Sequence, residues 1–550
     1  MNQKNSKKYL NFSFFILSFL IVAFSQPAWI GYLGPVASSL GYFLFWYSIY
    51  HLNSTKLKVF LSFVWFFFVQ AIWLSWFTST KYQGKLILVV YAFLIFSFAL
   101  QFSIASYIFL KNKKFSFFKI FLVASVWTIF EWSRLFFMSG FPFNQVGLAL
   151  SNYHISLQLA SIIGIYGLSF YVIFVNLTAL KAIIDKSFKV GILWVILAFF
   201  PYLYGYFHEK IYEKKFELSN KLNVCLVQTA LLPEEKVLTK NYFDHFISPM
   251  YQWQRIINFI NQKKIDDLDL IVLPEAALPF SANDHFYPFE KVQLLFSQKF
   301  GEDVLAKLPI LKEPFARQYK DDWYVSNSYF AKALSNIYQS EIAIGFDDFD
   351  QKIDKSYNAA FYFSPKLDTY KRYEKQVLVP MGEYIPFSFL AKIALKKYGI
   401  ASSFTKGDES KIFSDKNYAF SICYEETFSN IMRKAKNKGA KCFVNLTNDA
   451  YFPKSKLFRQ HFDHAKIRAV ENGIPLIRAC NTGITAVVDS FGRVVDAMYK
   501  EDEAGALFVK APLFSYKTIY SLFGDYLVIL FSSLVIISYF IQHKRRNKNE

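Results

Sequence analysis

Three polar side chains at the ends of apolar runs have the chemistry of acyl transfer. Cys423 ends the run YAFSIC, Glu275 ends the run LIVLPE, and Lys375 lies in the stretch YEKQVLVPMGEY. A cysteine at the end of a strand is usually a small buried hydrophobe. Combined with a carboxylate and an ammonium at the ends of other strands, however, a thiol suits covalent catalysis through a thioester.

Each of the three residues has a predicted role. Cys423 would be the nucleophile, and a nearby cation together with a helix N-terminus would favour its thiolate. Glu275 would be the general base, which takes the thiol proton and later returns it to a leaving group. Lys375 would place a positive charge beside the oxyanion of the tetrahedral intermediate.

Three further residues are predicted to support this site. Glu383 either orients Lys375 or shares the proton relay, and otherwise it is a surface carboxylate in a turn. Glu425 would hold the bend at the cysteine through backbone amides, as acids in a first helical turn do. Tyr424 either shapes an acyl pocket or is part of the core.

Motifs for other chemistries are weak or missing from the sequence. His461 and His464 lie three residues apart on a predicted helix, which indicates a structural helix more than a zinc site. The sequence has no HExxH, GxSxG, P-loop or GxGxxG motif. The four cysteines show neither CxxC spacing nor a disulfide framework, and Cys225, Cys442 and Cys480 fit core packing.

Apolar residues are distributed unevenly, which indicates a membrane protein with a large soluble domain. Hydrophobic residues make up 53% of the 550 residues and aromatic residues 20%. The predicted domains are a transmembrane bundle at 1–215, an extracytoplasmic catalytic domain at 216–512 and a closing helix with a basic tail at 513–550. The net charge of +20 arises from loop and scattered lysines, without any nucleic-acid-binding signature.

About eight segments are apolar and long enough to be membrane spans. They cover approximately 9–24, 29–50, 59–77, 86–110, 117–137, 157–184, 190–206 and 519–541. With the N-terminus inside, the inner segments hold sixteen Lys and Arg residues and the short outer loops hold Lys81, Lys85 and Arg134. This bias predicts an extracytoplasmic soluble domain. The first segment is predicted to be an uncleaved anchor, and Glu131 and Arg134 either pair at the interface or contact substrate.

The soluble part alternates between strand and helix patterns, which predicts an α/β domain with active residues at strand ends. Predicted strands cover 222–228, 268–273, 342–345, 359–363, 418–423, 442–446, 476–479, 484–489 and 506–509. Predicted helices cover 242–260, 425–437 and 460–472. The role of the long polar and aromatic insertion at 282–340 is not evident from the sequence.

The motifs resemble the Glu-Lys-Cys signature of the carbon–nitrogen hydrolase (nitrilase) superfamily. LPEAALPF contains Glu275, YEKQVLVPMGEYIPF contains Lys375 and Glu383, and SICYEE contains Cys423. The segment FEWSRLFFMSGFPFNQVG is similar to the membrane part of a lipid-modifying branch of this superfamily. The resemblance implies an αββα nitrilase-like sandwich on a helical bundle. It also implies a reaction without a metal or organic cofactor.

The same resemblance implies a ping-pong acyl transfer at a bacterial inner membrane. A phospholipid, usually phosphatidylethanolamine, would donate an acyl chain to Cys423, and the N-terminal amine of a diacylglyceryl apolipoprotein would accept it on the periplasmic side. A monomer is expected, with no nucleic-acid partner. Two alternatives remain open: a membrane-tethered amidase that uses water in the second step, and a non-catalytic membrane scaffold.

Overall fold

A computed structural model of the chain describes residues 3–111, 115–236, 245–263, 267–386 and 404–549. The chain forms two compact units. The first, called the helical unit, contains residues 1–214, 455–473 and 517–550, and the second, called the α/β unit, contains residues 215–454 and 474–516. The segment 455–473, which the sequence predicted within the soluble domain, therefore groups with the helical unit.

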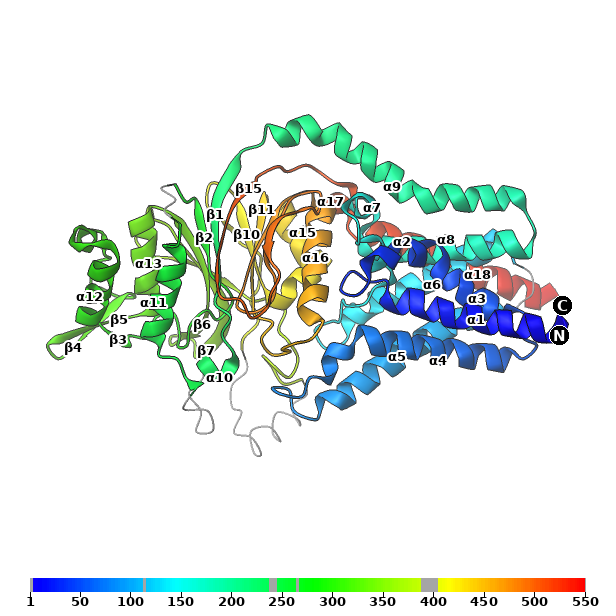
Figure 1. Ribbon diagram of the computed structural model, residues 1–550, viewed down its shortest axis with the longest axis horizontal. Coiled ribbons are helices and arrows are strands. Elements are labelled where there is room, and N and C mark those ends of the chain that lie inside the picture. The colour runs from blue at the N-terminus through cyan, green and yellow to red at the C-terminus, as the bar shows by residue number, and fades with distance from the viewer. Residues whose placement is uncertain (1–2, 112–114, 237–244, 264–266, 387–403, 550) are drawn as a thin grey trace. The chain divides into compact units, whose positions relative to one another are not determined.

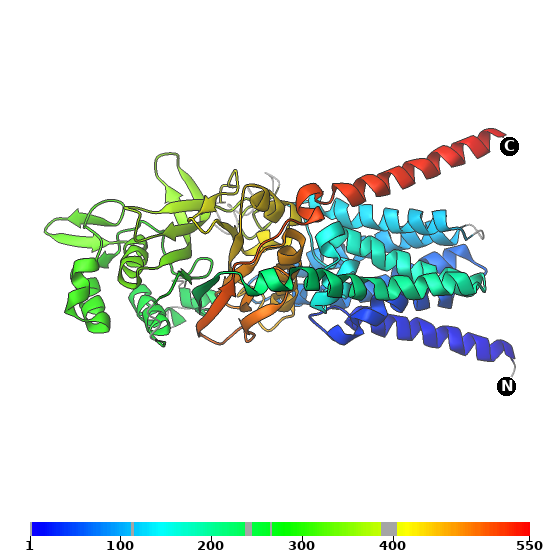
Figure 2. The same ribbon diagram turned by 90° about the horizontal axis from the view of Figure 1, so that it is seen from above.

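The helical unit consists of apolar helices that lie side by side (Figure 1). In chain order its helices are α1 (Gln3–Phe24), α2 (Gly34–Val36), α3 (Tyr42–Tyr50), α4 (Thr55–Trp73), α5 (Ile87–Leu110), α6 (Phe117–Ser133), α7 (His154–Leu157), α8 (Ala160–Ile184), α9 (Phe188–Glu217), α16 (Leu457–Asn472), α17 (Ile519–Phe523) and α18 (Tyr526–Asn549). Five of the described helices, α4, α5, α8, α9 and α18, are long and apolar enough to cross a membrane. The count of eight spans stays a prediction. α1 begins and α18 ends at the same end of this unit (Figure 2).

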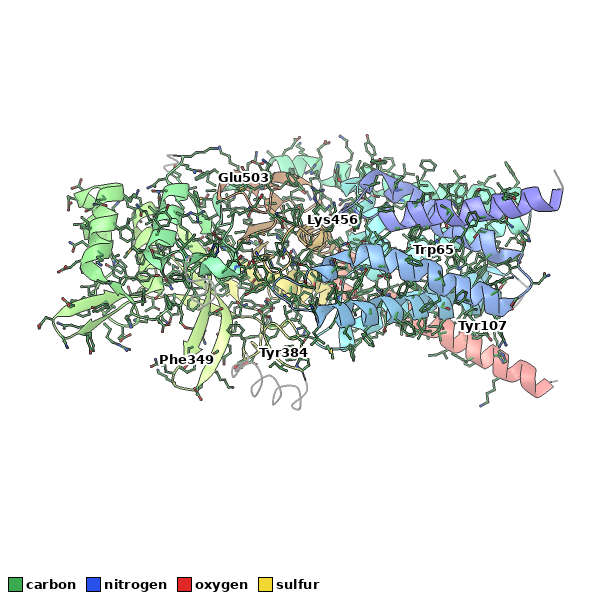
Figure 3. All side chains as sticks on the ribbon, turned by 60° about the horizontal axis from the view of Figure 1, so that its bottom comes forward. Trp65, Tyr107, Phe349, Tyr384, Lys456 and Glu503 are labelled. Carbon is green, nitrogen blue, oxygen red and sulfur yellow. The ribbon has the colours of Figure 1, made fainter. Side chains whose placement is uncertain are left out.

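Stacked aromatic rings form the centre of the helical unit. The rings of Phe45 and Trp65 lie 4.3 Å apart, and those of Phe66 and Phe102 lie 4.5 Å apart. Trp65 is buried among the helices (Figure 3). Aromatic pairs at these distances add stability beyond the area that they bury.

The helix α8 is broken at Gly164. Gly164 has a φ of 63°, and a Cβ atom there would lie 2.3 Å from the ring of Tyr520. The next amide, Ile165 N, donates to Glu471 Oε1 of α16 at 2.9 Å. α16 therefore caps the second part of α8, which explains its place in the helical unit.

Two six-stranded sheets form the α/β unit. The first has the order β15-β1-β2-β6-β7-β8, and the second has the order β14-β13-β12-β11-β10-β9. The strands of the first are β1 (Lys221–Gln228), β2 (Leu270–Val272), β6 (Glu341–Asp350), β7 (Lys355–Phe363), β8 (Lys371–Glu374) and β15 (Gly505–Pro512). Those of the second are β9 (Ile412–Phe413), β10 (Tyr418–Ile422), β11 (Cys442–Thr447), β12 (Leu476–Cys480), β13 (Thr485–Val488) and β14 (Val494–Met498). All nine predicted strands are present.

Side chains that alternate along β1 separate two cores. Leu222, Val224 and Leu226 pack between the two sheets, whereas Cys225 and Val227 pack on the opposite face. That face is covered by α11 (Pro249–Ile260) and α13 (Asn327–Tyr338), and α15 (Ser429–Asn437) lies beside β10 and β11 (Figure 1). The predicted layered α/β architecture is confirmed.

The insertion at 282–340 has secondary structure of its own, and one predicted helix begins later than expected. The insertion forms α12 (Phe289–Phe300), α13 and a small sheet of β3 (Tyr287–Pro288), β5 (Asp322–Val325) and β4 (Ala316–Tyr319). The predicted helix 242–260 begins only at Pro249, because the Ser248 side chain caps it, and 242–244 lie outside the described residues. The long hairpin of β6 and β7 carries Phe349 near its tip (Figure 3).

Gly345 of β6 allows the backbone after β2 to approach closely. A Cβ atom at this position would lie 2.6 Å from Glu275 Cα and 2.8 Å from Pro274 O. We expect Gly345→Ala to cost about 1–3 kcal/mol of unfolding free energy, because backbone atoms must move. Thermal unfolding of the detergent-solubilised protein measures this loss.

The matched control is Gly505→Ala in β15. A Cβ atom there would meet only the Met498 Cε atom, at 3.5 Å, which is an ordinary contact. The control should unfold like the parent protein. Equal unfolding midpoints for Gly345→Ala and the parent would contradict the requirement for glycine.

Candidate active site

Lys375 lies just after β8, between the carboxylates of Glu275 and Glu383. Its Nζ atom is 3.0 Å from Glu275 Oε1 and 2.7 Å from Glu383 Oε1. The lysine is only 1% exposed. Burial alone would lower the pKa of Lys375, but the two carboxylates outweigh it and raise that pKa. Lys375 is therefore a fixed positive charge.

Asn358 of β7 ties the same two carboxylates together from a second side. Its Nδ2 atom donates to Glu275 Oε1 at 2.7 Å and to Glu383 Oε1 at 2.8 Å. The Lys375 amide donates to the Asn358 carbonyl at 2.9 Å, which aligns the two residues. Sequence reasoning missed Asn358, because the pattern around it marks only a strand.

Cys423 follows the end of β10 and begins a single 3-10 turn, Cys423–Thr427. It has a φ of 50°, a left-handed conformation that is strained for a residue with a side chain. It interacts electrostatically with Glu275 and Lys375, and the Asn448 amide donates to its sulfur. The structure thus brings Glu275, Lys375 and Cys423 together.

The protonation state of Cys423 differs from the expectation of a favoured thiolate. Burial of the sulfur raises the pKa of Cys423 well above its usual value, and Glu275 and Asp449 raise it further. Lys375 and the Asn448 amide oppose this shift without reversing it. The 3-10 turn is too short to supply a strong helix dipole. At neutral pH Cys423 therefore rests as a thiol, and a base is needed to activate it.

Glu425 joins the bend at Cys423 to the segment that carries Lys375. Its carboxylate accepts hydrogen bonds from the amides of Ile422 (2.7 Å), Val377 (3.2 Å) and Gln376. Burial raises the pKa of Glu425 to about 7 despite these hydrogen bonds. The buried carboxyl group links the end of β10 with the chain after β8.

A second buried acid anchors the other side of this bend. Glu426 pairs with Arg478 of β12, and Arg478 Nη2 also lies 3.2 Å from Asp449 Oδ2. All three side chains are buried. Arg478 therefore offsets part of the negative charge of Asp449, which interacts electrostatically with Cys423. Neither Arg478 nor Glu426 was a sequence-based candidate.

Three other residues considered in the sequence analysis, Tyr424, His461 and His464, lie close to phenylalanine rings. The ring of Tyr424 packs edge-on against Phe428 at 5.0 Å, and a role in an acyl pocket stays a prediction. In the helical unit, His464 lies 5.1 Å from the ring of Phe143. His461 lies 6.4 Å from the same ring.

Two polar residues of the helical unit, Glu131 and Arg134, are buried within it, and both predicted roles, an interfacial pair or a substrate contact, stay predictions. Glu131 Oε1 accepts from Trp127 Nε1 at 2.9 Å and from Val146 N at 2.8 Å. Arg134 Nε donates to Gln101 Oε1 at 3.1 Å. Each charged side chain thus has its own polar partners within the unit.

Taken together, a thiol, a carboxylate and a fixed ammonium suit nucleophilic attack on a carbonyl carbon. Glu275 is placed to exchange a proton, and Lys375 is placed to stabilise negative charge. Glu383 and Asn358 hold these two groups in register. The arrangement fits transfer of an acyl group through a covalent thioester.

Two known protein families match this chain in sequence. The carbon-nitrogen hydrolase family matches residues 246–517. The N-terminal domain of apolipoprotein N-acyltransferase matches residues 13–178. These two matches cover parts of both structural units.

Curated relatives match almost the whole chain. An apolipoprotein N-acyltransferase of Chlamydia pneumoniae is 32% identical over 541 residues, which cover 94% of each chain. One of Chlamydia caviae is 30% identical over 544 residues, 95% of this chain and 96% of the relative. A member of branch 10 of the nitrilase superfamily from Saccharomyces cerevisiae is similar in structure, with 20% identity and a TM-score of 0.35, over 56% of this chain and 94% of that one.

The raised pKa of Cys423 leads to a prediction about the reactivity of its thiol. We expect Glu275→Gln to slow alkylation of Cys423 by iodoacetamide at pH 7 by roughly 100-fold, because the variant has no base to accept the proton. In the variant the rate should then rise about tenfold per pH unit through the neutral range, as the thiolate fraction does. Peptide mass spectrometry separates Cys423 from the three buried cysteines.

Glu409→Gln is the control for this measurement. Glu409 is an exposed acid that pairs with Lys438, and its loss should leave alkylation unchanged. Equal alkylation rates in Glu275→Gln and the parent protein would remove Glu275 from the role of base.

Proposed function

Because the chain belongs to the apolipoprotein N-acyltransferase family, we propose that it moves a fatty acyl chain from a membrane phospholipid to the N-terminal amine of a lipoprotein. The match to the Chlamydia pneumoniae relative, over 94% of both chains, carries this proposal. Several long apolar helices make the chain a membrane protein, as this substrate pair requires. The site in the α/β unit supports an acyltransferase reaction.

In the first half-reaction Glu275 takes the proton of Cys423, and the sulfur attacks the ester carbonyl of a phospholipid, with phosphatidylethanolamine as the expected donor. A carbon–sulfur bond forms, and the carbonyl oxygen becomes an oxyanion beside the Lys375 ammonium. The oxyanion collapses, the ester bond breaks, and Glu275 returns its proton to the leaving alkoxide. The products are a lysophospholipid and a Cys423 thioester.

In the second half-reaction the α-amine of a diacylglyceryl-cysteine attacks the thioester. Glu275 removes a proton from the attacking nitrogen, and Lys375 again faces the oxyanion. The carbon–sulfur bond breaks, and Glu275 gives the proton to the departing sulfur. An amide and the resting thiol result, so no proton is gained or lost by the enzyme. Removing one oxyanion donor typically lowers the rate by about 10²–10³-fold, and we expect a loss of this size when Lys375 is removed.

The supporting residues hold the reacting groups in position in this scheme. Glu383 and Asn358 hold Lys375 and Glu275, and Glu425 holds the bend at Cys423. Tyr424, next to the nucleophile, contributes to the wall that receives the acyl chain. No step draws on a metal ion or an organic cofactor.

Both substrates are held at a membrane, and we place the reaction at the outer face of a bacterial inner membrane. The excess of inner lysine and arginine residues, sixteen against three, supports this side. An enzyme anchored in the bilayer meets two lipid-anchored substrates by a planar search. Keeping water away from the thioester also limits its hydrolysis.

The acyl-enzyme is the direct test of this function. We expect the protein to retain label from a phospholipid that carries a radioactive acyl chain, and Cys423→Ser to lose this label, because the thioester forms on that sulfur. Mass spectrometry of a lipoprotein N-terminus should show the added acyl chain only with the active protein. Cys442→Ser, at a buried cysteine, is the control that keeps the label.

Two outcomes would contradict this function. A protein that hydrolyses small amides but never becomes acylated by phospholipid is a membrane-tethered amidase. A protein that does neither is a scaffold.

The proposed side of the membrane has its own test. In a Cys423→Ala background we expect a cysteine at exposed Asp321, in the turn between β4 and β5, to react with a membrane-impermeant maleimide in intact spheroplasts. A cysteine at Lys544, near the end of α18, should react only after lysis. Labelling in the reverse order would place the α/β unit in the cytoplasm.

A further inference from the structure

Lys236 is a buried lysine that the reaction scheme above does not use. It ends the one-turn helix α10 (Pro233–Lys236) and is 8% exposed. Its Nζ atom donates to the carbonyl oxygen of Ala276 at 2.8 Å. Burying a long cationic side chain is costly unless the charge has a specific partner. The partner here belongs to the residue that follows Glu275.

The backbone at Ala276 needs such a contact. Ala276 has a φ of 43°, a left-handed conformation that is strained for an alanine. On the other side, Ala277 N donates to Gly345 O at 2.9 Å, and Gly345 N donates to Pro274 O at 3.1 Å. The bend that aims Glu275 is therefore fixed by β6 on one side and by Lys236 on the other.

Lys236 also adds positive charge to an acidic site. The groups that interact with it electrostatically are Glu275, Asp347 of β6 and Glu235 of its own helix. Burial lowers the pKa of Lys236 to about 8, and Glu275 is the first of the groups that oppose this shift. At neutral pH most Lys236 side chains are charged.

The other charged and titratable groups around Glu275 come from separate elements. They are Lys375 after β8, Glu383 in the following turn, Asp347 of β6, Cys423 after β10 and Tyr451 after β11. Lys375 is shared between Glu275 and Glu383. Lys236 is therefore a second ammonium among the groups that surround Glu275.

We infer that Lys236 is a positioning residue for the general base, because its hydrogen bond to Ala276 fixes the backbone bend that aims Glu275. This inference rests on the role of Glu275 in the proposed function. It assigns Lys236 no contact with the substrate. Loss of Lys236 should therefore matter only while Glu275 is present.

The rate of Cys423 alkylation by iodoacetamide at pH 7 tests this inference without any acyl donor. In Lys236→Met the rate should fall by about 10–100-fold, because a displaced general base accepts the thiol proton less well. Added to Glu275→Gln, the same substitution should cause no further loss, because the base that Lys236 positions is already absent.

Two further variants test the contact itself. Lys236→Gln has a shorter side chain without the charge and should slow alkylation in the same way, which keeps the test valid if Lys236→Met does not fold. Lys236→Arg keeps both the donor and the charge and should restore the parent rate. Thermal unfolding of each variant reports whether the fold is intact.

Lys332→Met is the matched control. Lys332 is also buried in the α/β unit and donates to a backbone carbonyl, Ser364 O, at 2.9 Å, but its electrostatic partner is Asp368. Its loss should leave the alkylation rate unchanged. A parent-like rate in both Lys236→Met and Lys236→Gln, or a further loss of similar size when Lys236→Met is added to Glu275→Gln, would overturn the inference.

The test of Lys236 can fail independently of the test of the proposed function. Alkylation needs no phospholipid, so failure of acyl transfer would leave the effect of Lys236→Met measurable. Conversely, if Glu275→Gln slows alkylation and Lys236→Met does not, Glu275 remains the base and only the role of Lys236 falls.

Discussion

A buried ammonium shared by two carboxylates is the constraint on which the site depends. Lys375 is almost fully buried, and only the paired oxygens of Glu275 and Glu383 make its charge tolerable there. Removing one member of such a buried pair typically costs about 3–5 kcal/mol. Asn358 satisfies the same two oxygens without adding charge. Glu275, the proposed base, and Lys375, the proposed oxyanion donor, are therefore held by one interaction, and neither side chain can move without the other.

The proposed reaction also requires that Cys423 stays close to this ion pair. Glu425 connects the two. The residue lies two positions after Cys423, yet its carboxylate accepts amides from the segment after Lys375 as well as from Ile422. One side chain thus spans two sheets. Since Cys423 itself is in a strained left-handed conformation, the surroundings must hold it, and Glu425 together with the Glu426–Arg478 pair does so.

Sequence patterns predicted the strands and the three principal residues, because apolar runs that end in a polar side chain follow from local chemistry. Asn358 and Arg478 could not be found this way. Asn358 matters because β7 pairs with β8 so that Ala359 stands opposite Glu374, and such a register between strands is set by tertiary packing. The place of α16 in the helical unit likewise depends on distant contacts, such as that of Glu471 with Ile165. The expected thiolate was wrong because the sequence gives no measure of burial.

The raised pKa of Cys423 changes where activation must come from. A single 3-10 turn supplies little dipole, and Glu275 and Asp449 oppose a second negative charge nearby. In the proposed reaction the sulfur anion forms as its proton moves to Glu275, which leaves the total charge of the site unchanged. The same proton would then serve the leaving group, so neither proposed half-reaction needs a proton from bulk water. A site that conserves its proton in this way can exclude water throughout, and excluding water is what preserves a thioester until an amine arrives.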